Sequence, residues 1–140
     1  MEQQEHSTIP REQRIWAVAS GKGGVGKSLV SSSLAVMLAS LHENVVAIDM
    51  DLGNANMHTC MGIKYPRLTL NDFLTGDVND LRELSLDTPL YNLKLISGAG
   101  GIVGLSNPLH AQKLKLLRHI EKLPAESIVL DLGAGSSFNT

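Results

Sequence analysis

Four short apolar-rich runs divide the chain, at residues 14–20, 45–48, 93–96 and 128–130. Each is followed within two residues by glycine or aspartate. Short apolar runs bounded by turn residues are typical of strands that are buried on both faces of a sheet. We therefore predict four buried strands.

Between these runs, apolar residues recur at helical spacing. Residues 27–41 are predicted as a helix, and residues 69–74 and 78–84 as two short helices. A further helix is expected to begin at Asn107-Pro108, an N-cap residue followed by proline, and to end before Pro124. The predicted apolar faces are Val30, Leu34, Met37, Leu38 and Leu41 in the first helix, and Leu109, Leu116, Leu117, Ile120 and Leu123 in the last.

Strands that alternate with helices favour the α/β class, with a parallel sheet covered by helices on both faces. In such sheets, ligands bind at the carboxyl ends of the strands. The most polar and glycine-rich segments of the chain fall there: residues 21–28, 49–51, 98–101 and 131. We therefore expect one functional site at that edge of the sheet.

The composition is that of a soluble globular domain. The chain has 140 residues, of which 43% are hydrophobic and 19% charged, and its net charge is −2. With 4% aromatic residues and no basic excess, nucleic-acid binding is not expected. The lone Cys60 excludes an internal disulfide and a paired-cysteine metal site, and fits a reducing cytoplasm. Residues 1–13 are predicted to be a flexible tail, and residues 14–140 to form the folded part.

One glycine-rich motif indicates a specific chemistry, phosphate binding. Residues 21–28 read G-K-G-G-V-G-K-S, which fits the phosphate-binding pattern G-x-x-x-x-G-K-[ST]. Glycines bring backbone N–H groups against phosphate oxygens, and the following helix adds its positive N-terminal dipole. Lys27 would reach the β- and γ-phosphates, and the Ser28 hydroxyl suits magnesium. The alternative is a glycine-rich turn between a strand and a helix.

Lys22 stands one residue after the first glycine, which makes the segment resemble the deviant Walker A loop of the MinD/ParA family of P-loop ATPases. The resemblance implies a three-layer fold, ATP and Mg²⁺ as cofactors, and an ATP-dependent homodimer. In that dimer Lys22 would reach the partner subunit's nucleotide and stabilise charge as the phosphoryl bond breaks. The alternative for Lys22 is a solvent-exposed loop lysine. The implied nucleotide-binding residues are Gly21, Lys22, Gly23, Gly24, Val25, Gly26, Lys27, Ser28, Leu29 and Gly133.

Three strand-end aspartates complete the expected site. The resemblance implies that Asp51 orients the attacking water, which makes Lys22, Lys27 and Asp51 the catalytic set. It also implies that Ser28, Asp49, Asp51 and Asp131 surround the magnesium, with Asp131 in the Walker B position. The alternative is that these aspartates serve only turns and helix caps, which is common after strands.

Residues 49–56 and 131–135 most resemble the FlhG/FleN branch of this family, which regulates flagellar number and placement. That resemblance implies a regulatory protein partner. Domains of the family run to about 250 residues, so we expect this chain to be the N-terminal portion of one, with an unpaired sheet edge. Membrane association is expected only through a C-terminal segment not present here. A nucleotide-binding module without hydrolysis, a ParA-like partition ATPase and a metallocluster carrier are the alternative functions.

Overall fold

The computed structural model describes residues 12–19, 26–51, 56–64, 66–98 and 110–132. In chain order, the elements are β1 (Arg14–Val18), α1 (Gly26–Ser40), β2 (Val45–Asp49), α2 (Met57–Cys60), α3 (Leu70–Leu74), the 3-10 helix η1 (Leu81–Leu84), β3 (Leu86–Asp87), β4 (Leu93–Ile96), α4 (His110–Glu121) and β5 (Ser127–Asp131). None of the described helices is long and apolar enough to cross a membrane.

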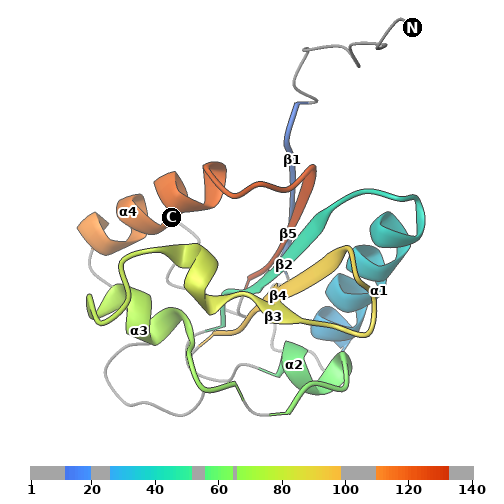
Figure 1. Cartoon of the computed structure of the whole chain (residues 1–140), viewed down its shortest axis with the longest axis horizontal. Helices are drawn as coiled ribbons and strands as arrows, with labels where there is room; N and C mark the ends of the chain where they lie inside the picture. The colour runs from blue at the N-terminus through green and yellow to red at the C-terminus, as the bar shows by residue number, and fades with distance from the viewer. Residues whose placement is uncertain (1–11, 20–25, 52–55, 65, 99–109, 133–140) are drawn as a thin grey trace, which may run out of the picture.

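The strands form one sheet in the order β1-β5-β2-β4-β3. Strands β1, β5, β2 and β4 are parallel to one another, and the two-residue β3 runs antiparallel to β4. Helix α1 lies on one face of this sheet, and α3 and α4 lie on the other (Figure 1). The predicted α/β fold with a mainly parallel sheet between helices is confirmed.

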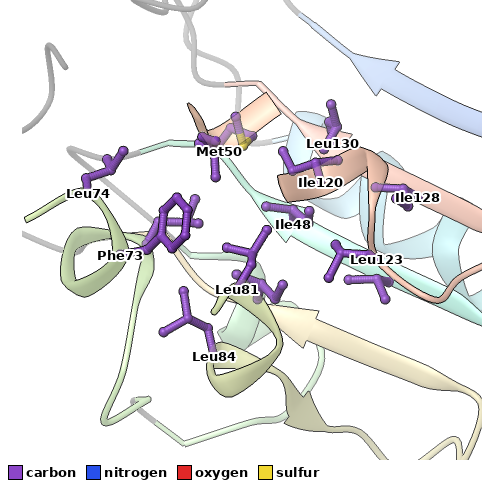
Figure 2. Packing of buried hydrophobic residues seen from close by; sticks show 14 of the residues in the cluster. Ile48, Met50, Phe73, Leu74, Leu81, Leu84, Ile120, Leu123, Ile128 and Leu130 are labelled. Carbon is purple, nitrogen blue, oxygen red and sulfur yellow. The ribbon is translucent and has the colours of Figure 1, made fainter. Parts of the chain in front are cut away.

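Two apolar clusters hold the three layers together. Along β2, Val46 and Ile48 face the cluster that contains Phe73 of α3 and Ile120 of α4, which Figure 2 shows from close by. The alternate residues of β2, including Ala47, face α1 in the second cluster. Because both faces are covered, residues 45–48 of this strand are all apolar, as the sequence predicts.

The buried face of α1 differs from the predicted one. Val30, Met37 and Leu41 are exposed by 57%, 53% and 64%, while Leu34 and Leu38 do pack against the sheet. The residues of α1 that are buried are small apart from Leu38: Ser28, Ser31, Ser32, Ala35, Leu38 and Ala39. Small side chains let the helix axis lie close to the strands, so side-chain size and not apolar periodicity selects the face.

Helix α4 follows its prediction more closely. Leu116, Ile120 and Leu123 are buried, whereas Leu117 is exposed, so its place on the predicted face is wrong. The predicted helix start at Asn107-Pro108, and Leu109, lie outside the described residues. The helix presents only one narrow stripe to the sheet, and Leu117 lies beside that stripe.

Three local predictions are corrected. Strand β1 is not buried: Ile15 and Trp16 are exposed, because the only neighbour of β1 in the described sheet is β5. Residues 78–84 do not form one helix; η1 begins only at Leu81, after Asp80, whose side chain accepts from the backbone N–H of Arg82. Strand β3 was not predicted, because two residues are too few to show the alternation of apolar and polar side chains that indicates a strand.

Candidate functional site

The described part of the phosphate motif is the first turn of α1. The helix begins at Gly26, so Lys27 and Ser28 lie in its first turn, and their side chains are held at the carboxyl edge of the sheet. Leu29, on the next position, is exposed. Six expected nucleotide-binding residues lie outside the described residues: Gly21, Lys22, Gly23, Gly24, Val25 and Gly133.

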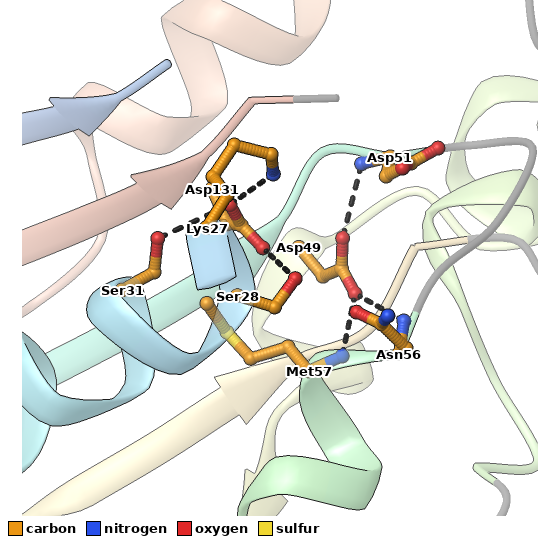
Figure 3. Close-up of polar contacts among 8 residues, drawn as sticks. All are labelled: Lys27, Ser28, Ser31, Asp49, Asp51, Asn56, Met57 and Asp131. Atoms are coloured by element: carbon orange, nitrogen blue, oxygen red, sulfur yellow. Dashed lines mark hydrogen bonds and ion pairs between the residues drawn. The ribbon is translucent and has the colours of Figure 1, made fainter. Parts of the chain in front are cut away.

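Strand β5 delivers a carboxylate to this helix start. Asp131 ends β5 and has no solvent exposure. Its Oδ1 is ion-paired with Lys27 Nζ, and its Oδ2 accepts a hydrogen bond from Ser28 Oγ at 2.7 Å. Ser31 Oγ, one turn further along α1, donates to Oδ1 at 3.1 Å (Figure 3). Three donors from a single helix therefore converge on one buried carboxylate.

Asp49 lies beside Asp131 because β2 and β5 are parallel and in register, which makes the two residues Cα partners. The Asp49 side chain is buried and accepts backbone N–H groups: that of Asp51 on Oδ1, and those of Asn56 and Met57 on Oδ2, each at 3.0 Å. It thereby fixes the chain that follows β2 to the start of α2.

Burial raises the pKa of Asp49 from 3.8 to about 6. The backbone N–H groups of Met57 and Asp51 oppose this rise because they stabilise the carboxylate, whereas the negative charges of Asp131 and Asp51 add to it. The raised pKa of Asp49 is therefore due mainly to its burial, and the two neighbouring carboxylates make a smaller contribution. Such a site favours a cation.

Asp51 is placed differently from the other two aspartates. Its backbone N–H contacts Asp49, while its carboxylate points away from Lys27, Ser28 and Asp131 in Figure 3. The structure therefore brings together Lys27, Ser28, Asp49 and Asp131, and leaves the Asp51 carboxylate apart from them. Its role with the attacking water stays a prediction.

The donor set at this edge fits magnesium together with a phosphate ligand. Two buried carboxylates and one hydroxyl are hard oxygen donors of the kind that Mg²⁺ prefers. Within the described ranges, no group of three or more His, Cys, Asp or Glu side chains could hold a metal ion by itself. Mg²⁺ is commonly held by one or two carboxylates plus substrate phosphates and waters, so a nucleotide would supply the remaining ligands.

Ser31 is the residue of this cluster that the sequence reasoning missed. The fixed pattern of the phosphate motif ends at Ser28 and says nothing of the following turn. A signal was present: Ser31 follows Ser28 by three residues, and this spacing places both side chains on one face of a helix.

The fold and this edge together define a P-loop nucleotide-binding protein. A sequence profile of the ParA family, described as an NUBPL iron-transfer P-loop NTPase, matches residues 11–100. That match covers more than half of the chain. The chain belongs to the MinD/ParA family of P-loop NTPases.

Individual relatives agree with this assignment. An uncharacterized ATP-binding protein of Methanocaldococcus jannaschii is 36% identical over 89% of this chain and 46% of its own length. The antiactivator FleN of Pseudomonas aeruginosa is 36% identical over 87% of this chain and 43% of its own. The septum site-determining protein MinD of Pyrococcus horikoshii, solved with Mg-ADP, matches with a TM-score of 0.72 and 30% identity, over 89% of this chain and 50% of its own.

These matches establish the family and not a branch within it. FleN is one of several similar relatives, and MinD proteins match over a similar share of the chain. The chain spans about half the length of the curated relatives it matches.

Proposed function

We propose that this chain is the nucleotide-binding part of a MinD-like ATPase switch, which forms a homodimer with ATP and separates after hydrolysis. The observation that carries the proposal is the convergence of Lys27 and Ser28 with the buried Asp131 at the carboxyl edge of the sheet. Membership of the MinD/ParA family and the Mg-ADP bound to the MinD of Pyrococcus horikoshii support it.

The described side chains have distinct tasks in this proposal. Lys27 binds the β- and γ-phosphate oxygens, and Ser28 and Asp131 would hold the Mg²⁺ that accompanies the nucleotide. Mg²⁺, when bound, supplies positive charge that neutralises the phosphate oxygens. Asp49 fixes the segment after β2 through three backbone N–H groups, and so sets where Asp51 stands.

The remaining roles are proposed from the family resemblance. Lys22 contacts the nucleotide of the partner subunit, Gly133 offers its backbone N–H to the γ-phosphate, and Asp51 orients water for attack. The output is spatial regulation in the cytoplasm through a protein partner. The resemblance of residues 49–56 and 131–135 to the FlhG/FleN branch makes flagellar number or placement the proposed process.

Calorimetry with Mg²⁺-ATP tests the proposal on the 140-residue chain and on Lys27→Ala. Lys122→Ala is the control, because it makes the same substitution at an exposed lysine outside the site. Charged hydrogen bonds contribute about 1.5–3 kcal/mol, so Lys27→Ala should weaken binding by about 10- to 100-fold. Lys122→Ala should bind as the parent does. Circular dichroism establishes that each variant is folded.

No binding by a folded parent chain would refute the proposed nucleotide site. Binding without release of phosphate would instead support the rival function, a nucleotide-binding module that does not hydrolyse ATP. A phosphate-release assay on the same samples therefore separates these two.

Iron transfer, the activity in the description of the matching profile, finds no support in the residues present. Cys60 is the single cysteine of these 140 residues, and it is exposed. One thiolate cannot supply the paired ligands that a cluster shared across a dimer needs. Iron analysis of the purified chain tests this.

A further inference from the structure

Three side chains meet at Asp131, and nucleotide binding needs one of them elsewhere. In the structure its two oxygens accept from Lys27, Ser28 and Ser31. Lys27 and Ser28 are also the two side chains that the proposed function assigns to phosphate and metal. The Ser28 hydroxyl can donate its proton to Asp131 while its oxygen binds the metal, whereas Lys27 must turn toward the phosphates, so nucleotide binding draws Lys27 away from Asp131.

That exchange would leave the buried Asp131 carboxylate with two hydroxyl donors, Ser28 on Oδ2 and Ser31 on Oδ1. Asp131 has no solvent exposure, and a buried carboxylate that loses its partners is strongly disfavoured. Ser31 is fully buried as well, one turn deeper in α1 than Ser28. Its hydroxyl donates a hydrogen bond to Asp131 Oδ1 at 3.1 Å (Figure 3).

From this geometry we propose that Ser31 is a positioning residue for Asp131. It holds Oδ1 when Lys27 leaves for the phosphates, and so keeps Oδ2, the oxygen on the Ser28 side, directed at the metal position. The inference rests on the proposed function, because it assigns a task in the same nucleotide site. Ser31 itself contacts neither nucleotide nor metal.

The neighbouring residue provides a matched control. Ser32 is also a buried serine of α1, but its Oγ has no hydrogen-bond partner among the described residues. Ser31→Ala and Ser32→Ala therefore remove the same atom from adjacent buried positions, and only the first removes a contact to Asp131.

The test measures ATP binding by calorimetry, first in excess EDTA and then as a function of Mg²⁺ concentration. Substitution of a residue that orients a metal ligand commonly lowers metal affinity by about 10- to 100-fold. Ser31→Ala should therefore raise by about 10-fold the Mg²⁺ concentration at which the effect of Mg²⁺ on ATP binding is half-maximal. Its affinity for ATP in EDTA should stay within about 2-fold of the parent, because Lys27 remains. Ser32→Ala should follow the parent in both conditions.

A second pair of variants isolates the hydroxyl if the alanine variant does not fold. Ser31→Thr keeps the hydroxyl, and Ser31→Val has nearly the same shape without it. The expected result is that the threonine variant responds to Mg²⁺ at lower concentration than the valine variant. Equal responses would overturn the inference.

The remaining outcomes separate this inference from the proposed function. If the parent binds ATP with a clear Mg²⁺ dependence and Ser31→Ala matches Ser32→Ala, the inference alone is overturned. Equal losses of affinity by Ser31→Ala with and without Mg²⁺ would also overturn it, because they indicate a general structural effect. If the folded parent binds no ATP, the proposed function falls and this inference with it.

Discussion

The ion pair between Lys27 and Asp131 makes a quantitative prediction about the nucleotide-free protein. Both side chains are almost fully buried, with exposed fractions of 7% and 0%. Removing one member of a buried pair costs about 3–5 kcal/mol, because the other charge is left without compensation. Ser28 and Ser31 still donate to Asp131 in Lys27→Met, so we expect the lower end, about 3 kcal/mol.

The double variant should cost far less than the sum of the single ones. Asp131→Asn leaves the Lys27 ammonium buried opposite a neutral amide, and we again expect about 3 kcal/mol. In Lys27→Met/Asp131→Asn neither charge of the pair remains, so the total should be about 3–4 kcal/mol instead of about 6. The coupling energy between the two positions is therefore about 2–3 kcal/mol.

Urea unfolding followed by circular dichroism measures this cycle, in EDTA and without nucleotide. The slope of the unfolding free energy with urea should be the same for all four proteins, which shows that only stability has changed. Losses that add within about 0.5 kcal/mol would refute the reasoning. They would mean that Lys27 is not ion-paired with Asp131 in the nucleotide-free protein. The inference about Ser31 would then fail, because it assumes that Lys27 leaves Asp131 when nucleotide binds.

Two further predictions concern the α1 face and the buried Asp49. Ala35→Leu should destabilise the fold by about 1–3 kcal/mol through overpacking, while Val30→Lys should stay within about 0.5 kcal/mol; equal losses in urea unfolding would contradict the observed face. Burial holds the pKa of Asp49 at about 6, above its unfolded value of 3.8, so the folded state binds more protons between these values. Stability relative to Asp49→Asn should therefore fall by about 2 kcal/mol from pH 4 to pH 7 without Mg²⁺, and a flat difference would contradict this.

The place of the site was predictable because it depends on topology and not on packing detail. Aspartates that directly follow apolar strands, Asp49 and Asp131, must meet at one edge if the strands are parallel. The in-register pairing of these two residues follows from this rule. The glycine-rich motif added the helix start, and hence Lys27 and Ser28, to the same edge.

The face of α1 was not predictable in the same way. Periodicity counts apolar side chains, and it selected Val30, Met37 and Leu41, which are exposed. The helix instead approaches the sheet through small buried residues, among them Ala35 and three serines, because small side chains allow close contact. The burial of β1 was mispredicted for a related reason, since it depends on which elements lie beside the strand and not on its own residues.

The serines of α1 also explain why the apolar pattern failed where it did. Asp131 is a carboxylate at the end of a buried strand, and its burial is costly unless donors reach it from the adjacent layer. Helix α1 is that layer, so its sheet-facing side must carry hydroxyls such as those of Ser28 and Ser31 where a purely structural helix would carry leucine or valine. Local rules of sequence patterning are commonly broken at functional sites. The polar character of Ser31, on the buried side of the helix that follows the phosphate motif, is thus explained by the buried carboxylate opposite it.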